Sequence, residues 1–205
     1  MIIAVDGPSA SGKGTIARAV ADHYGLPYLD TGLLYRAVGF AVAQAGGDVD
    51  NAADGLAACT FDDALLTHNA LRSEATGGLA SRVSVHPAVR AALLARQRAF
   101  AAQSGGAVLD GRDIGTVIAP GADAKLFITA TPEIRAARRH QDEPAKTYAD
   151  ILADIRLRDE RDAGRSDAPL RQAEDADLLD TSDLTIGDAV QRAIALVEAR
   201  LVRRA

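Results

Sequence analysis

Short apolar runs alternate with longer segments of helical periodicity along this 205-residue chain. The apolar runs lie at residues 2–5, 27–29, 107–109, 125–129 and 178–179, and turn-forming or charged residues follow them, which predicts five β-strands. The segments with helical periodicity lie at residues 15–24, 34–44, 87–103, 132–140, 148–162 and 186–203. Because strands and helices alternate, we expect an α/β fold with a central parallel five-stranded sheet and helices on both faces.

Two segments interrupt this alternation. Residues 57–85 contain short β-like pieces at 59–61, 64–66 and 70–71, which predict a small inserted subdomain. Residues 141–146 are polar, contain Pro144 and link two arginine-bearing helices, so we interpret them as the tip of a short lid.

The most specific motif follows the first predicted strand. Gly7, Gly12 and Lys13 have the spacing of a phosphate-binding loop, and a predicted helix begins directly after them. Backbone N–H groups of such a loop surround nucleotide phosphates, the lysine reaches the β and γ positions, and the helix dipole favours the same anion. Gly14 separates Lys13 from Thr15, a spacing that resembles nucleoside monophosphate kinases.

Two polar segments follow other predicted strands, on the sheet edge where ligands of such folds bind. Thr31 is predicted to cap a helix, and Arg36 lies near that helix's start, which the dipole disfavours unless an anion is bound there. Asp110 ends a strand at a position that suits the water shell of Mg²⁺. Arg112 and Asp113 place a phosphate donor beside an acceptor, although a mutual surface ion pair is an alternative.

Arginines gather on the two predicted helices that flank the polar tip. Arg158, Asp162 and Arg165 are spaced to share one helix face. Acidic residues are interleaved with the arginines, so one interpretation is a solvated helix with many salt bridges. The other is a closing lid that brings arginines to a transferring phosphoryl group.

Composition narrows the functional classes. The net charge of −5 and an aromatic content of 4% argue against a nucleic-acid partner. Cys59 is the single cysteine, so no intramolecular disulfide can form, and the four histidines lack metal-ligand spacing. No apolar run approaches the ~18 residues of a membrane helix, so we expect no membrane association and a cytoplasmic location. Only three of the 23 basic residues are lysines, which makes Lys13 in the glycine loop more specific.

These motifs together resemble the bacterial cytidylate kinases, a family of P-loop nucleoside monophosphate kinases. The resemblance rests on residues 6–15, 30–36, Ser81, Arg90, 110–116 and 158–165, and spans nearly the whole chain. It implies the P-loop nucleoside-monophosphate-kinase fold in a single domain, residues 1–205. The core would comprise 1–56, 86–134 and 163–205, with an NMP-binding insertion at about 57–85 and a lid at about 135–162.

The resemblance also implies an activity and a role for each matching residue. The reaction would be transfer from MgATP to CMP or dCMP, catalysed by a monomer. ATP would be bound by Gly7, Pro8, Ser9, Ala10, Ser11, Gly12, Lys13, Gly14 and Thr15. CMP would be bound by Thr31, Tyr35, Arg36, Ser81, Arg90, Arg112, Asp113, Arg158, Asp162 and Arg165. Among these, cytosine would be recognised by Ser81, Arg90 and Asp113. The CMP phosphate would be bound by Arg36, Arg112 and Arg165, and the pentose by Arg158 and Asp162. The arginines of the lid would be Arg135, Arg138, Arg139 and Arg161. The catalytic residues would be Lys13, Arg112 and Arg158. Asp110 would hold Mg²⁺ through water.

Two alternatives stay open at this point. One is another small P-loop kinase that acts on UMP, shikimate or dephospho-CoA, against which Tyr35, Arg36 and residues 110–116 argue. The other is a non-catalytic nucleotide-binding module, against which Lys13 and the arginine set argue. In the favoured reaction the attacking phosphate oxygen is already ionised, so no general base is expected.

Overall fold

The computed structural model describes residues 1–204, which fall into two compact units. Unit 1 comprises Met1–Leu29 and the chain from Ala101 onward, and unit 2 comprises Asp30–Phe100. Among the described residues, no helix combines the length and the apolar character that crossing a membrane requires.

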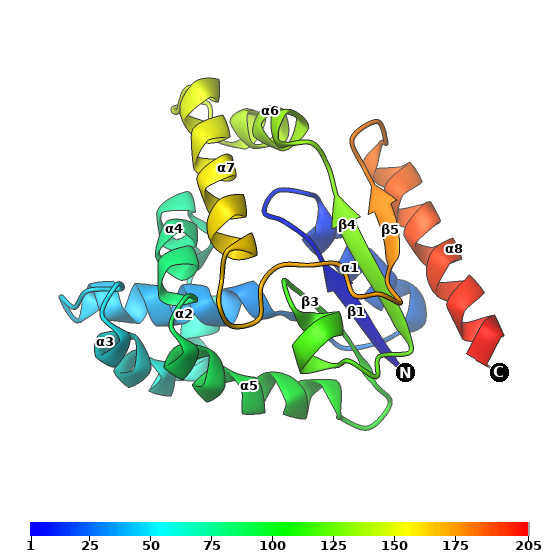
Figure 1. The fold of residues 1–205 in the computed structure, drawn as a ribbon, viewed down its shortest axis with the longest axis horizontal. Coiled ribbons are helices and arrows are strands. Elements are labelled where there is room, and N and C mark those ends of the chain that lie inside the picture. The colour runs from blue at the N-terminus through cyan, green and yellow to red at the C-terminus, as the bar shows by residue number, and fades with distance from the viewer. Residues whose placement is uncertain (205) are drawn as a thin grey trace. The chain divides into compact units, whose positions relative to one another are not determined.

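Unit 1 is built on a five-stranded sheet (Figure 1). Its strands are β1 (Ile2–Asp6), β2 (Tyr28–Asp30), β3 (Ala107–Gly111), β4 (Ala124–Thr129) and β5 (Asp177–Asp180). They are ordered β2-β3-β1-β4-β5, and β1 pairs in parallel with both β3 and β4. All five strands lie within a residue or two of the positions that the apolar runs predict, which confirms the α/β interpretation.

The helices of unit 1 also lie close to their predicted positions. They are α1 (Lys13–Tyr24), the π-helix η4 (Ile114–Ile118), α6 (Pro132–Asp142), α7 (Tyr148–Ala163) and α8 (Ile186–Arg204). Side chains alternate between the faces of a strand. Ile3 and Val5 therefore pack with α1 and α8 on one face, while Asp6 reaches η4 on the other. The π-helix was not predicted, because a five-residue turn has no periodic signal.

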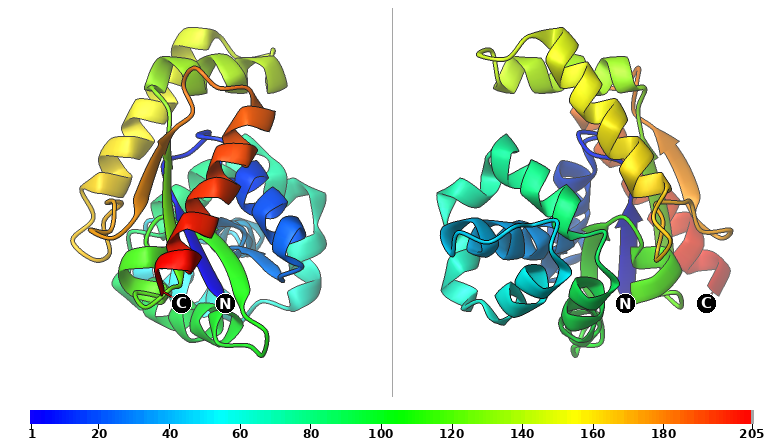
Figure 2. Two further views of the ribbon diagram at one scale, coloured as in Figure 1. Left: turned by 90° about the vertical axis from the view of Figure 1, so that its right-hand side faces the viewer. Right: turned by 60° about the vertical axis from the view of Figure 1, so that its left-hand side comes forward.

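The helices α6 and α7 form a pair beyond the carboxyl end of β4 (Figures 1 and 2). Ala136 of α6 packs against Ile151 and Ile155 of α7. Thr131 and Thr147 cap the two helices by accepting hydrogen bonds from Ile134 N and Asp150 N. The pair covers the residues that the sequence assigns to a lid.

Unit 2 is helical throughout, which corrects the prediction of β-like pieces. Its helices are α2 (Thr31–Gln44), α3 (Ala52–Ala57), η1 (Ala58–Thr60), η2 (Asp63–Thr67), η3 (Asn69–Arg72), α4 (Glu74–Val83) and α5 (Pro87–Ala101). The apolar runs at 59–61, 64–66 and 70–71 lie mainly in the three 3₁₀ turns. Asp62 and His68 accept hydrogen bonds from Ala64 N and Ala70 N, which fixes η2 and η3 as turns rather than extended chain.

The cap of α2 is a second correction. Asp30, not Thr31, is the N-cap, and its carboxylate accepts a hydrogen bond from Leu33 N. Thr31 is the first helical residue and its side chain is buried. The carboxylate one residue earlier is an equally good capping group, so sequence alone did not separate the two.

Close packing of α2 on α4 centres on Gly39. A Cβ at this position would lie 2.8 Å from Leu79 Cβ and 3.0 Å from the Leu79 carbonyl carbon. At Gly78, in the interior of α4, a Cβ would meet no atom within 4 Å. An alanine side chain would therefore clash at position 39 but would fit without contact at position 78.

We predict that Gly39→Ala destabilises the protein by about 1–3 kcal/mol, because the added methyl group overpacks the contact with Leu79. The matched variant Gly78→Ala should instead stabilise it by about 0.5–1 kcal/mol, because alanine is the better helix residue in open space. Urea denaturation measures both free energies of unfolding. Equal effects of the two substitutions would contradict this account of the α2–α4 contact.

Candidate phosphate-binding site

The segment from Gly7 to Gly12 connects β1 to α1 with a constrained backbone. A Cβ at Gly7 would lie 2.0 Å from the carbonyl oxygen of Ile128, so only glycine lets the loop approach β4 this closely. Gly12, with φ of 86°, is the N-cap of α1 and provides no side-chain cap, and the first turn of α1 contains no acidic residue. The first N–H groups of α1 are thus left for an anion, and Lys13 begins the helix beside them.

Two hydroxyl groups in this loop are suited to binding a polar ligand. Ser9 and Ser11 are buried, and neither Oγ atom has a hydrogen-bond partner among the described residues. Buried hydroxyl groups are normally hydrogen-bonded, so two such groups in one short loop require an explanation. A bound phosphate chain would provide acceptors for them.

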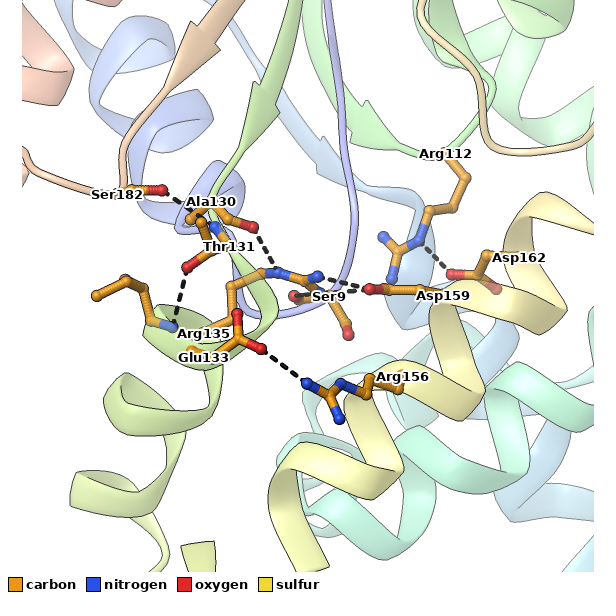
Figure 3. Close-up of polar contacts among 11 residues, drawn as sticks. Ser9, Arg112, Ala130, Thr131, Glu133, Arg135, Arg156, Asp159, Asp162 and Ser182 are labelled. Carbon is orange, nitrogen blue, oxygen red and sulfur yellow. Dashed lines mark hydrogen bonds and ion pairs between the residues drawn. The ribbon is translucent and has the colours of Figure 1, made fainter. Parts of the chain in front are cut away.

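The carbonyl groups of the loop are held from the opposite direction (Figure 3). Arg135 of α6 is buried and donates hydrogen bonds to Ser9 O, Ala130 O and the Asp159 carboxylate. Thr181 donates from Oγ1 to Ser11 O at 3.1 Å. Arg138 in turn donates to the Thr181 carbonyl oxygen, so α6 supports the loop through two routes.

These contacts define what the α6 arginines do in this structure. Arg135 and Arg138 bind protein acceptors, and Arg139 lies 3.7 Å from Glu143. Arg156 of α7 forms an exposed ion pair with Glu133 of α6 at 2.8 Å (Figure 3). A direct role of Arg135, Arg138, Arg139 and Arg161 as phosphate ligands stays a prediction.

Asp110 lies directly beside the loop. The Tyr28 hydroxyl donates a hydrogen bond to Asp110 Oδ2 at 2.7 Å. A Cβ at Gly14 would lie 3.2 Å from the same oxygen, and the Arg18 guanidinium lies over the Tyr28 ring, 4.6 Å from its centroid. The unusual glycine after Lys13 is therefore explained by the carboxylate that it faces.

The Asp110 carboxylate suits an Mg²⁺ ion that is bound together with nucleotide phosphates. Within residues 1–204, no group of three or more His, Cys, Asp or Glu side chains is arranged to hold a metal ion. Mg²⁺ keeps several waters and is commonly held by one or two carboxylates together with substrate phosphates. Asp110 beside a phosphate loop fits this pattern.

A cluster of arginines surrounds one buried carboxylate on α7. Asp162 accepts a hydrogen bond from Arg112 Nε at 2.7 Å (Figure 3). It also forms an ion pair with Arg165. Burial raises the pKa of Asp162, but Arg112, Arg165 and Arg158 outweigh burial and the net effect lowers it. The carboxylate is therefore ionised at neutral pH. Guanidinium groups match the geometry of phosphate oxygens, so the arginines around Asp162 suit an anionic ligand.

Asp113 lies in unit 1, where it is the N-cap residue of η4. Unit 2 holds the predicted site residues from Thr31 to Arg90. Arg36 Nη1 donates to Leu71 O and Ser73 O at 2.8 and 2.7 Å, which fixes its guanidinium at the start of α4. The Arg90 guanidinium lies over the ring of Tyr35, 5.8 Å from the centroid. Ser81 and Arg90 are both buried although both are polar. Unit 2 thus contains a set of buried polar groups, as expected of residues that recognise a polar ligand.

Sequence reasoning missed several supporting residues of the site. Tyr28 and Thr181 carry no motif, and each acts through a contact with a residue distant in sequence. Asp159 belongs to the segment 158–165 that carries the resemblance, which does not predict its contact with Arg135. Asp6 belongs to the segment 6–15 that carries the resemblance, which gives this residue no role. Arg135 is one of the arginines gathered on the predicted helix 132–140.

Comparison with known proteins gives a consistent result over the whole chain. The family model described as cytidylate kinase matches residues 3–199. A cytidylate kinase of Xanthobacter autotrophicus is 59% identical over 100% of both chains. A cytidylate kinase of Caulobacter vibrioides is 55% identical over 96% of this chain and 95% of its own. These matches confirm the resemblance that the motifs indicated.

Solved structures agree at the level of the fold. A gluconokinase from Sinorhizobium meliloti superimposes with a TM-score of 0.59 at 16% identity, over 98% of this chain and 94% of its own. The protein TT1252 from Thermus thermophilus gives a TM-score of 0.50 at 21% identity, over 98% and 97%. At such identities the likeness concerns the fold alone.

We predict that Tyr28→Phe lowers the free energy of unfolding by about 1–2 kcal/mol, because the Asp110 carboxylate loses a charge-assisted hydrogen bond. Tyr24→Phe is the matched control, since the buried Tyr24 hydroxyl has no partner among the described residues. Its removal should change stability by less than about 0.5 kcal/mol or increase it slightly. Chemical denaturation of both variants tests the contact; equal stability losses would argue against it.

Proposed function

The chain belongs to the cytidylate kinase family and is a nucleoside monophosphate kinase, and we propose that it transfers the γ-phosphoryl group of MgATP to CMP or dCMP. The observation that carries this proposal is the match to cytidylate kinases over the entire chain. The phosphate loop and the arginine cluster around Asp162 supply the chemistry that such a reaction needs. A different phosphate acceptor, or a module without catalytic activity, is not favoured.

The donor nucleotide is assigned to the loop of unit 1. Residues 7–15 would surround the ATP phosphates with N–H groups, with the Ser9 and Ser11 hydroxyls as further donors. Lys13 would stabilise the charge on the transferring group. Mg²⁺ held through water by Asp110 would neutralise part of the phosphate charge.

The acceptor nucleotide is assigned to the residues that match the acceptor-binding motifs of the family. Arg36, Arg112 and Arg165 would bind the CMP phosphate, and Asp162 with Arg158 would bind the pentose. Ser81, Arg90 and Asp113 would recognise cytosine, whose exocyclic amine can donate to the Asp113 carboxylate. Thr31 and Tyr35 complete this set. Uracil has no such amine, so UMP would leave a buried acceptor without a partner.

Catalysis then rests on alignment and charge. The attacking oxygen of CMP is a phosphate oxygen that is ionised at neutral pH, so the reaction needs no general base. Lys13, Arg112 and Arg158 would offset the negative charges that otherwise repel the two nucleotides. The pair α6–α7 would exclude water as a lid of about residues 135–162, with the segment at about 57–85 as the NMP-binding insertion.

Several further expectations belong to this proposal. The enzyme would act as a monomer in the cytoplasm on small nucleotides, without a nucleic-acid or membrane partner. The net charge of −5 supports the absence of nonspecific nucleic-acid binding. Size-exclusion chromatography with light scattering would test the oligomeric state.

We predict that an ADP-release assay ranks CMP and dCMP above UMP and AMP. Asp113→Asn should lower kcat/KM for CMP on the order of 10²-fold and reduce the preference over UMP, because an amide can donate to the uracil carbonyl. Preference of the unmodified enzyme for AMP over CMP would overturn the assignment. An unchanged CMP-to-UMP ratio in Asp113→Asn would remove Asp113 from base recognition.

We also predict that Lys13→Ala lowers kcat by about 10²–10³-fold, because a charge on the transferring group is lost. Arg192→Ala is the matched control, since Arg192 is an exposed cation on α8, outside the loop and the lid. It should leave kcat within about twofold, because an exposed surface charge contributes little. Comparable losses in both variants, each shown by circular dichroism to be folded, would contradict the role of Lys13.

A further inference from the structure

Asp6 is a buried carboxylate immediately before the phosphate loop, and the reaction as described gives it no role. It is the last residue of β1, pairs across the sheet with Gly111 and is 4% exposed. Its side chain points to the face of the sheet that carries η4. The next residue, Gly7, is locked against the backbone of β4.

Both oxygens of Asp6 bind consecutive backbone N–H groups. Oδ1 accepts from Ile114 N and Oδ2 from Gly115 N, each at 2.8 Å. These N–H groups open the π-helix, so they have no partner within it. The carboxylate thereby fixes the chain that directly follows Arg112 and Asp113.

The space around this contact is closed. A Cβ at Gly115 would lie 3.4 Å from Asp6 Oδ2 and 3.1 Å from Lys125 Cδ. Lys125 of β4 is itself buried and donates to Asp175 at 2.8 Å. The contact therefore holds the segment after β3 in one position.

A carboxylate is a costly choice for this task. Burial raises the pKa of Asp6 to about 7, because the two backbone hydrogen bonds offset it only in part. Asp113 raises the pKa further and Arg112 lowers it, while Lys125 of β4 lies near the same contact. Two N–H groups in succession need an acceptor on each oxygen, and the ionised carboxylate accepts both hydrogen bonds more strongly than the protonated carboxyl does.

We propose that Asp6 is a positioning residue for the acceptor nucleotide: it fixes Arg112 and Asp113 relative to the phosphate loop through the N–H groups of Ile114 and Gly115. This inference rests on the proposed function, because it takes Arg112 and Asp113 as CMP ligands. One carboxylate thus links the loop assigned to ATP with the segment assigned to CMP. The link is covalent to Gly7 on one side and hydrogen-bonded on the other.

Ionisation of Asp6 favours this arrangement but opposes folding. Its pKa in the folded state lies above the ordinary aspartate value of 3.8, so the protonated form is the one that folding stabilises. The resulting contribution to stability is complete below about pH 4 and is lost as the pH rises through about 7. CMP binding should follow the opposite trend and improve over the upper part of this range.

The test is Asp6→Asn, which keeps the size of the side chain but leaves one oxygen acceptor. KM for CMP should rise about tenfold, the equivalent of one lost charge-assisted hydrogen bond, while KM for ATP changes less than about twofold. The matched control is Asp123→Asn, since Asp123 accepts from Ile2 N at 2.7 Å at the other end of the same strand. This control should change neither KM.

Two further readouts keep the inference testable if Asp6→Asn does not fold. Gly115→Ala adds a methyl group 3.4 Å from Asp6 Oδ2 and should also raise KM for CMP without raising KM for ATP. In the unmodified protein, the amide resonances of Ile114 and Gly115 should shift with pH with a midpoint near 7. The phosphate of CMP titrates near pH 6, so pH profiles of activity are compared between variant and unmodified enzyme.

The outcomes separate the two proposals. If the unmodified enzyme does not phosphorylate CMP, the proposed function fails whatever the variants do. If it phosphorylates CMP and a folded Asp6→Asn retains its KM for CMP, the role of Asp6 is overturned. Equal increases in both KM values would also overturn it, because they indicate a general structural loss.

Discussion

A phosphate loop can present its N–H groups to a ligand only if its carbonyl groups are satisfied elsewhere. In this chain Arg135 and Thr181 provide donors for Ser9 O and Ser11 O, and Gly7 lies against the backbone of β4. These supports come from α6 and from the segment after β5, both distant in sequence from the loop. The packing of unit 1 thereby orients the backbone of residues 7–15.

Carboxylates provide the second level of organisation. Asp159 forms an ion pair with Arg135, and Asp162 binds Arg112 and Arg165. Asp6 accepts hydrogen bonds from two backbone N–H groups. Each carboxylate fixes a group that a ligand could also use or a segment that carries such a group. These carboxylates orient the arginines before an anion binds, which lowers the entropy that binding would cost.

The sequence predicted most of unit 1 and less of unit 2, for physical reasons. The strands and long helices have strong periodicity, and the spacing of Gly7, Gly12 and Lys13 is specific to phosphate binding. The 3₁₀ turns of unit 2 are too short for a periodic signal, and Gly77 and Gly78 weaken the helical signal of α4. Residues such as Tyr28 and Thr181 act through tertiary contacts, which no local pattern encodes.

The contact of Gly14 with Asp110 also constrains how this protein can change over generations. The 3.2 Å separation between a Cβ at residue 14 and Asp110 Oδ2 leaves little space for any other side chain. A larger residue at position 14 requires the Asp110 carboxylate to shift by a few tenths of an ångström, and that shift changes its hydrogen bond with Tyr28. Positions 14, 28 and 110 therefore form an epistatic group, in which the order of substitutions decides whether each one is tolerated.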